Sequence, residues 1–312
     1  MTGCELDVLA VGEAMVDLIS VEQVESLAEA HAFEAHVGGQ AANLAANVAR
    51  LGGRSAVLGR VGDDGLGQTV RRGLAAAGVD TTLLAGHPEA PTTVSLVART
   101  SGTPDFIVLR GADRLLDHGD LEQARPPARL VHTSAFALSR EPARGAVLRM
   151  LEAAHAEGTR VSLDPNYHPS VWPPGEEHLD VLEQAFRTVD VTKPSLDDCE
   201  RLFGRAEPEE HLERFLAWGA RLVVLTLGRD GALVGRPDAP GRSVPAEAVD
   251  VVDVTGAGDA FWAGFLLALG DGLDDEAAVR VGHRVAAIKL QRVGQLPDHV
   301  DRTAIYRELA AV

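Results

Sequence analysis

The segment 253–259, Asp-Val-Thr-Gly-Ala-Gly-Asp, carries the residue types of an anion-binding site. Gly256 and Gly258 permit a tight turn, and the apolar run that follows predicts a helix directly behind it. Unpaired amides at a helix start bind anions without any lysine. There Asp259 can accept the proton of a hydroxyl that attacks phosphorus, while the amides of Gly256, Ala257 and Gly258 stabilise the phosphoryl charge. The helix dipole predicts an ionised Asp259. The alternative is an ordinary glycine-rich turn in which Asp259 merely starts a helix.

A second glycine pair, Gly38-Gly39, opens another predicted helix with Asn43 in its first turn. Paired glycines allow a ligand to approach the backbone closely, and the Asn43 amide can both donate and accept hydrogen bonds. These properties suit a polyhydroxylated ligand better than a charged one. The alternative is that Asn43 only satisfies nearby backbone groups.

The charge balance excludes several classes of protein. The 312 residues contain 29 Lys plus Arg and 46 Asp plus Glu, a formal net charge of −17, whereas a nucleic-acid surface needs a basic stripe. Lys193 and Lys289 are the only lysines, and neither precedes Ser or Thr as a P-loop lysine does. Phe261 stands where the third glycine of a dinucleotide fingerprint belongs.

Nothing in the chain indicates export or a membrane. Cys4 and Cys199 form no disulfide framework, and residues 1–17 lack the basic start of a secretory signal. No apolar run reaches the length of about 18 residues that a transmembrane helix needs. The scattered histidines show no zinc motif. We therefore expect a cytoplasmic protein with neither membrane nor nucleic-acid partners.

Short apolar runs alternate with helical patterns, which predicts βαβ units and a mainly parallel sheet. Segments 16–37 and 92–110 break the alternation and predict a small strand excursion that covers one edge of that sheet. The expected strands are 7–11, 55–59, 130–133, 161–164, 189–192, 222–226 and 232–234. The expected helices are 40–51, 68–77, 141–157, 179–188, 196–203, 211–218, 259–269 and 276–291.

Three motifs, read together, resemble one enzyme family. Gly38-Gly39 with Asn43, the run 59–67 and the run 253–259 are similar to motifs of the ribokinase-like, or phosphofructokinase B group, carbohydrate kinases, nearest to 2-keto-3-deoxygluconate kinases and fructokinases. The resemblance covers nearly the whole chain. It implies an α/β fold, a three-layer α/β/α sandwich with a mainly parallel central sheet and a small β-sheet lid. It also implies a single domain, 1–312, with lid strands at about 13–37 and 92–112.

The resemblance also assigns roles to single residues. Asp259 matches the catalytic base, and Gly256, Ala257 and Gly258 match the anion hole, with Gly258 also at the ATP phosphates. The residues that match sugar contacts are Asp17, Gly38, Gly39 and Asn43; without the family, Asp17 would be a strand-end carboxylate. The residues that resemble the turn beside ATP are Thr226, Gly228 and Gly231. Asp253 and Thr255 resemble ligands of a monovalent cation, usually potassium.

Two positions depart from the family pattern. After Lys193, which resembles an ATP-site residue, the family often has Asn-x-x-Glu, but this chain has Ser195 and Asp198, shorter oxygen ligands for magnesium through water. The segment 164–172 resembles a substrate region in which Asn166 is retained. There His168 replaces an arginine, so a fixed charge becomes dependent on pH.

The conclusion from the sequence is an ATP-dependent sugar kinase that uses Mg²⁺ and acts on 2-keto-3-deoxygluconate or fructose. Arg110 is a candidate substrate contact from the lid, or else a solvated surface residue. Alternatives are a ribose or nucleoside kinase, which needs an aromatic pocket although aromatics are 4% of the chain, and a silent sugar-binding regulator. The family also predicts a homodimer through the lid.

Overall fold

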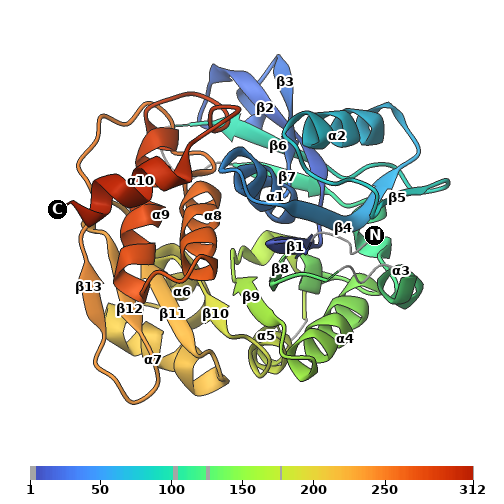
Figure 1. Ribbon diagram of the computed structural model, residues 1–312. Helices are drawn as coiled ribbons and strands as arrows, with labels where there is room; N and C mark the ends of the chain where they lie inside the picture. The colour runs from blue at the N-terminus through green and yellow to red at the C-terminus, as the bar shows by residue number, and fades with distance from the viewer. Residues whose placement is uncertain (1–4, 101–104, 124–126, 176–177, 312) are drawn as a thin grey trace.

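The computed structural model describes residues 5–100, 105–123, 127–175 and 178–311. Its larger sheet has nine strands in the order β13-β12-β11-β10-β9-β8-β1-β4-β5 (Figure 1). All neighbours pair in parallel except at β11–β12 and β12–β13. The strands of this sheet are β1 Val8–Val11, β4 Ser55–Gly62, β5 Leu84–His87, β8 Leu130–Ser134, β9 Arg160–Asp164, β10 Val191–Thr192, β11 Leu222–Thr226, β12 Ala232–Gly235 and β13 Arg242–Val244.

Helices cover both faces of the larger sheet because its strands are apolar on both sides. Val8 of β1 packs into a core with α1, α8, α9 and α10, whereas the next residue, Leu9, packs into a core with α4, α5 and α7 on the other face. The helices are α1 Gln40–Arg50, α2 Gly65–Ala76, α3 His118–Gln123, α4 Ala143–Ala156, α5 His178–Phe186, α6 Leu196–Phe203, α7 Pro208–Trp218, α8 Ala257–Gly270, α9 Asp275–Leu290 and α10 Arg302–Ala310.

A separate four-stranded sheet, the lid sheet, stands at the top of Figure 1 in the order β3-β2-β6-β7. Its strands are β2 Met15–Gln23, β3 Phe33–Gly38, β6 Val94–Arg99 and β7 Phe106–Leu109. Alternation along these strands gives the lid sheet two different faces. Asp17 and Phe106 lie on one face, whereas Leu18, Ile107 and Leu109 lie on the other.

The expected fold class is confirmed: helices cover both faces of a mainly parallel sheet, and a smaller sheet stands apart. The single-domain division stays a prediction. Several helix starts were placed too late, because α2 begins at Gly65 behind the cap residue Asp64, and α7 begins at Pro208. The strands β5 and β13 were not expected. Among the described helices none is both long and apolar enough to cross a membrane.

Candidate active site

Polar residues gather at the carboxyl ends of the parallel strands, the edge where open α/β sheets bind their ligands. Glu13 follows β1, Asp164 ends β9, Lys193 follows β10 and Thr226 ends β11. The start of α8 and the lid sheet lie beside the same edge, since α1, which begins directly after β3 of the lid sheet, packs against α8. This topology brings together residues that are far apart in the chain.

The loop before α8 makes the predicted glycine turn, but the Ala257 amide donates to the Val254 carbonyl at 3.2 Å and is not free for an anion, contrary to expectation. Gly256 has a left-handed backbone, with φ of 73°, and precedes a helix that receives no side-chain cap from any described residue. The amides of Gly258 and Asp259 likewise have no acceptor among the described residues, so they are available to an anion. A Cβ at Gly258 would lie 3.5 Å from Lys193 Nζ, which places the Lys193 ammonium beside these amides.

Asp259 lies in the first turn of α8, where Asn43 Nδ2 donates to its Oδ2 at 3.0 Å. This bond joins two motifs that are 216 residues apart. Burial raises the pKa of Asp259 to about 7, and the negative charges of Asp164 and Asp17 raise it too, while Lys193 and Asn43 oppose the rise. Desolvation and neighbouring carboxylates thus oppose the expected effect of the helix dipole, and Asp259 is partly ionised at neutral pH.

Asp17 lies on β2 of the lid sheet, and its charge acts on Asp259. Its carboxylate fills the space that a side chain at Gly38 would need, which explains that glycine. Gly39 has φ of 95° and lies against the Glu13 carbonyl, so it too must lack a Cβ. Burial raises the pKa of Asp17 to about 6. Burial removes water from the Asp17 carboxylate. A substrate hydroxyl could donate a hydrogen bond to it in place of that water.

Sequence reasoning missed Glu13, which is 1% exposed. Ser134 Oγ and the Gln40 amide donate to its carboxylate at 3.0 Å. Burial raises the pKa of Glu13 to about 7, against the opposing effects of Ser134 and Arg110. The available signal was its position directly after a buried strand, in the run Gly12-Glu13.

A buried hydrogen-bond network around His132 was also missed. His132 shares its ring nitrogens with Gln40 Oε1 and Ser162 Oγ, each at 2.9 Å, and Gln40 Nε2 donates to Asp164 Oδ2 at 3.4 Å. Burial lowers the pKa of His132 to about 3, so the ring is neutral. Asp164, the last member of this network, also forms an ion pair with Lys193 Nζ at 3.1 Å. This network fixes Asp164 and Lys193 as a charged pair under the site.

Arg110 is not a solvated surface residue, so that alternative is wrong. Its guanidinium pairs with Asp113 at 2.6 Å, donates to Ser139 Oγ at 2.6 Å and lies 4.0 Å from the centre of the Phe136 ring. Its charge also acts on Glu13. The structure thus ties Arg110 to the body below the lid; its contact with substrate stays a prediction.

The 164–172 segment places its two predicted residues differently. Asn166 is exposed, with φ of 32°, and its amide donates to Asp164 Oδ1 at 3.1 Å. His168 packs edge-on against Phe106 of the lid sheet, with ring centres 4.5 Å apart. Burial, followed by the charge of Arg201, lowers the pKa of His168. His168 is therefore mostly neutral at pH 7 and forms a body-to-lid contact.

Ser195 and Asp198 form a capping box at the start of α6. The Asp198 carboxylate accepts hydrogen bonds from Ser195 N and Oγ and from Tyr167 N, and Asp198 is 4% exposed. This arrangement leaves little of the carboxylate for hydrated magnesium, so the pair fits that ion poorly. Thr226 binds the same loop, since its amide donates to the Pro194 carbonyl at 2.9 Å.

Gly228 and Gly231 flank a short turn after β11, and both have positive φ, 60° and 100°. No described atom lies within 4 Å of a Cβ built at Gly228, so this side of the turn is open. The expected contact with ATP stays a prediction for Thr226, Gly228 and Gly231.

The expected cation ligands Asp253 and Thr255 lie at the base of the loop before α8. The Thr255 amide donates to Asp253 Oδ1 at 3.0 Å, and Lys289 Nζ donates to Asp253 Oδ2 at 3.1 Å. Burial opposes ionisation of Asp253, but these bonds outweigh it and lower its pKa. Among the described residues, no group of three His, Cys, Asp or Glu side chains is placed to hold a metal ion.

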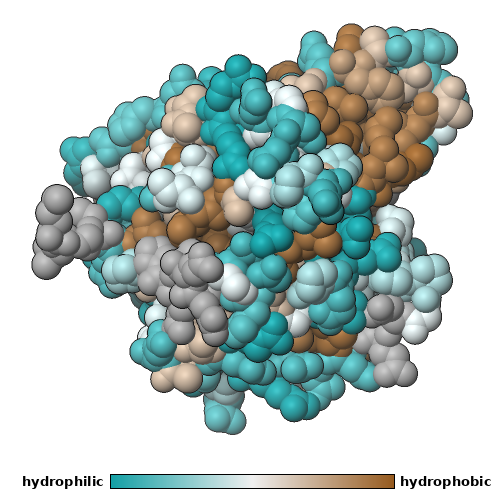
Figure 2. Space-filling model, turned by 90° about the vertical axis from the view of Figure 1, so that its right-hand side faces the viewer, coloured by the Kyte–Doolittle hydropathy of each residue, from teal (hydrophilic) through white to brown (hydrophobic). Residues whose placement is uncertain are grey.

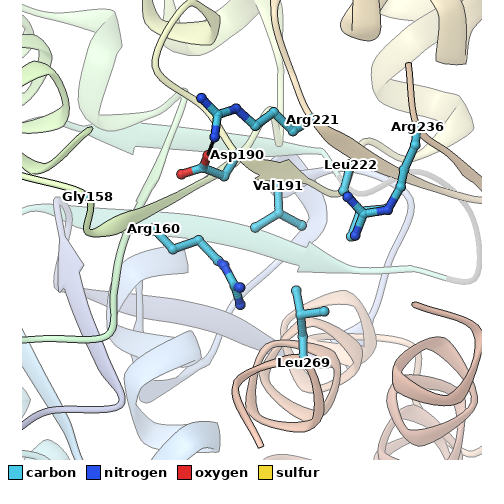
Figure 3. A pocket seen from close by; sticks show the side chains of 8 residues that line it. All are labelled: Gly158, Arg160, Asp190, Val191, Arg221, Leu222, Arg236 and Leu269. Carbon is cyan, nitrogen blue, oxygen red and sulfur yellow. Dashed lines mark ion pairs between the residues drawn. The ribbon is translucent and has the colours of Figure 1, made fainter. Parts of the chain in front are cut away.

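A cavity of about 300 Å³ lies at the other edge of the sheet. Figure 3 shows its lining, which includes Arg160, Val191 and Leu222 at the amino ends of β9, β10 and β11. Arg221 there is paired with Asp190 at 3.3 Å. The cavity is thus separated from Asp259 by the length of the strands and is not the candidate active site.

Three known proteins are similar in sequence to this chain over most of their length. The chain is 36% identical to an ATP-dependent 6-phosphofructokinase of Thermoanaerobacterium thermosaccharolyticum, over 95% of this chain and 91% of that protein. It is 34% identical to fructokinase-1 of Oryza sativa subsp. japonica, over 95% of each. The fructokinase of Vibrio cholerae O395, solved with fructose, ADP and calcium, is 31% identical with a TM-score of 0.85 over 97% of this chain and 98% of that one.

A double mutant of the Vibrio enzyme, solved with fructose, ADP and potassium, has a TM-score of 0.86 at 31% identity, over 98% of this chain and 99% of that one. The model of the pfkB family carbohydrate kinases matches residues 5–299. This match spans both glycine motifs, Asp259 and the lid sheet. In the structure Asn43 donates to Asp259, and Asp17 of the lid sheet lies against Gly38. The chain therefore belongs to the pfkB family and is a sugar kinase with a ribokinase-like fold.

Proposed function

We propose that this kinase transfers the γ-phosphate of ATP to a hydroxyl of a neutral sugar, with fructose as the favoured substrate. The observation that carries the proposal is the carboxylate of Asp259, held by Asn43 next to open amides and opposite Asp17. A sugar hydroxyl between these groups has a proton acceptor on one side and anion-binding amides on the other. That combination suits phosphoryl transfer.

In the proposed reaction Asp17 and Asn43 orient the sugar, and Asp259 takes the proton of the attacking hydroxyl. A base with a pKa of about 7 is well matched to neutral pH, because it is ionised in much of the protein yet basic enough to accept a proton. The amides of Gly258 and Asp259 and the ammonium of Lys193 stabilise the negative charge on the moving phosphoryl group. The lid sheet excludes water, which limits hydrolysis of ATP.

ATP and magnesium enter the proposal through the relatives and the cleft. The Vibrio cholerae fructokinase was solved with ADP and calcium, which supports a nucleotide and a divalent ion here as well. Magnesium commonly keeps several waters and binds through substrate phosphates. Ser195 and Asp198 hydrogen-bond to each other in a capping box. We therefore propose that magnesium arrives with ATP, and we assign it no protein ligand. Bound magnesium would neutralise phosphate charge.

Charge at the sugar end of the cleft favours fructose over the two anionic candidates. Fructose 6-phosphate and 2-keto-3-deoxygluconate would bring a negative charge towards Asp17 and Glu13. Arg110 is paired with Asp113, although its Nε and Nη2 make no hydrogen bond to the described residues, so its charge is already partly neutralised; His168 has a lowered pKa. The hydroxyls of a neutral polyol instead donate hydrogen bonds to these carboxylates.

The test is ADP release with Mg-ATP and a panel of fructose, fructose 6-phosphate, 2-keto-3-deoxygluconate, ribose and adenosine. We expect the highest kcat/KM with fructose. The Asp259→Asn variant should keep the Asn43 contact and ADP binding but lose at least about 100-fold in kcat. A higher kcat/KM for another acceptor would overturn only the choice of sugar. No ADP with any acceptor would favour a sugar-binding regulator over a kinase.

We also propose a homodimer through the outer face of the lid sheet. Ile107 and Leu109 are 52% and 59% exposed there, and Figure 2 shows hydrophobic surface gathered where this sheet stands out from the body. A second copy would cover both residues. Light scattering should give twice the 32.9 kDa of one chain, and Ile107→Asp should give the mass of a single chain. A single-chain mass for the unmodified protein would contradict this proposal.

A further inference from the structure

Lys289 lies at the end of α9, and its side chain is buried at 4% exposed. Its ammonium donates three hydrogen bonds, to the Asp253 carbonyl at 3.4 Å, to Asp253 Oδ2 at 3.1 Å and to the Arg292 carbonyl at 3.2 Å. An ammonium has three protons, and each has its own oxygen. Lys289 is therefore satisfied where it lies and has no need to reach a ligand.

The acceptors of Lys289 form an unusual set for an ion pair. Two are backbone carbonyls and one is a carboxylate, and they come from two loops that meet at this point. Carbonyl and carboxylate oxygens are the ligands that hard cations prefer in proteins. They surround a single compact positive charge, because the lysine ammonium, unlike the planar guanidinium of arginine, concentrates its charge at one atom. The Lys289 ammonium thus occupies an oxygen cage suited to a monovalent cation.

The cage is joined directly to the anion-binding loop. The Asp253 amide donates to the Leu290 carbonyl at 3.2 Å, and the Gly294 amide donates to Asp253 Oδ2 at 3.4 Å. Thr255 then bonds back to Asp253, one residue before Gly256 turns the chain into α8. Asp253 thus anchors the first turn of the loop whose amides would meet the phosphoryl group. Contacts that fix the position of Asp253 therefore also fix the position of the loop amides before α8.

We propose that Lys289 serves as a built-in monovalent cation, which positions the 253–259 loop in place of a free potassium ion. Lys289 is a positioning residue, since it touches Asp253 and Arg292 and no reacting atom. Of the two residues expected to hold potassium, Asp253 already accepts from the ammonium through its carbonyl and its Oδ2, so a free ion does not fit beside Lys289. The proposal predicts that potassium neither stabilises nor activates this kinase.

Two variants of Lys289 separate charge from volume. Lys289→Ala removes the ammonium and leaves room for an ion among the same oxygens, whereas Lys289→Met fills the space with an uncharged chain. Each protein is melted in KCl and in tetramethylammonium chloride at the same ionic strength, about 0.1 M, so that general screening is equal. Tetramethylammonium is too large for the cage and serves as the inert salt.

The expected melting temperatures differ in a pattern that a purely structural role would not give. The unmodified protein should melt at the same temperature in both salts. Lys289→Ala should melt lower in tetramethylammonium and recover several degrees in KCl, because an ion that binds only the folded state stabilises it. Lys289→Met should melt lower in both salts. A potassium-specific rise in the unmodified protein, or a folded Lys289→Ala that ignores potassium, would overturn the proposal.

Activity provides a second readout, which rests on the proposed function. With fructose and Mg-ATP, the unmodified kinase should turn over equally in both salts. Lys289→Ala should lose about 10-fold or more in kcat in tetramethylammonium, the scale of a displaced charge-stabilising donor, and regain much of it in KCl. If no sugar is phosphorylated, the proposed function fails while the melting experiment still decides the role of Lys289. If neither variant folds, potassium dependence of the unmodified protein decides it.

Discussion

The two lysines of this chain lie in two similar pairs with different surroundings. Lys193 pairs with Asp164, and Lys289 pairs with Asp253, each at 3.1 Å. Both lysine side chains are buried, but Asp164 is 3% exposed and Asp253 is 23% exposed. The first pair belongs to a side-chain network under the cleft, whereas the second is enclosed mainly by backbone oxygens behind the anion-binding loop.

This difference shows how a strongly acidic chain uses lysine. Of 29 basic residues two are lysines, which leaves 27 arginines, and most arginine ion pairs among the described residues lie at the surface. Arginine needs space for a planar fork, whereas lysine places one compact charge among oxygens. Both lysines stand where such a charge is enclosed, one on each side of the 253–259 loop.

The largest effect is expected for Lys193→Met. This variant leaves the Asp164 carboxylate buried without its ion, and removal of one partner of a buried pair costs about 3–5 kcal/mol. Urea unfolding followed by circular dichroism should show that loss in the free energy of unfolding. The double variant Lys193→Met/Asp164→Asn is the control and should recover part of it. Equal stability of Lys193→Met and the unmodified protein would mean that Asp164 is neutral in the fold.

The fold was largely predictable from the sequence because its signals are local. Strands that are buried on both faces give apolar runs, and helices between them give a 3.6-residue period, so α6 was placed at its observed bounds. The glycine motifs likewise fit local needs, since Gly256 has the left-handed backbone of a turn and the Asp17 carboxylate fills the space of a Cβ at Gly38. Such features depend on a few neighbouring residues.

The second pair was not predictable for the opposite reason. Lys289 and Asp253 are separated by 36 residues, and their contact depends on how the end of α9 meets the loop before α8. From sequence, Lys289 served only to exclude a P-loop. The raised pKa of Asp259 was not predictable for the same reason, because burial and the charges of Asp164 and Asp17 depend on the tertiary fold, whereas the helix dipole is local.

The pH dependence of turnover should distinguish the two pairs. Asp259 acts when ionised, so kcat should rise through about pH 7 and level off above it; below pH 7 it should fall towards tenfold per unit. Lys193 lowers the pKa of Asp259, so Lys193→Met should move the midpoint to higher pH. Lys289 contacts Asp253 rather than Asp259, so Lys289→Met should lower kcat without moving the midpoint. If both variants moved the midpoint of the pH profile, the two lysines would not have the different effects on Asp259 that we expect.

The smallest effect on stability is expected for Lys289→Met. Asp253 keeps the hydrogen bonds of the Thr255 and Gly294 amides, and it is exposed enough for water to replace part of the lost ion. A partly solvated pair is worth less than a buried one, so we expect a loss of about 1 kcal/mol. The same urea unfolding measures it, next to Lys193→Met. If Lys289→Met loses as much as Lys193→Met, then the exposure of the carboxylate does not govern the two pairs. In that case the backbone carbonyls around Lys289 depend on its charge as strongly as Asp164 depends on that of Lys193.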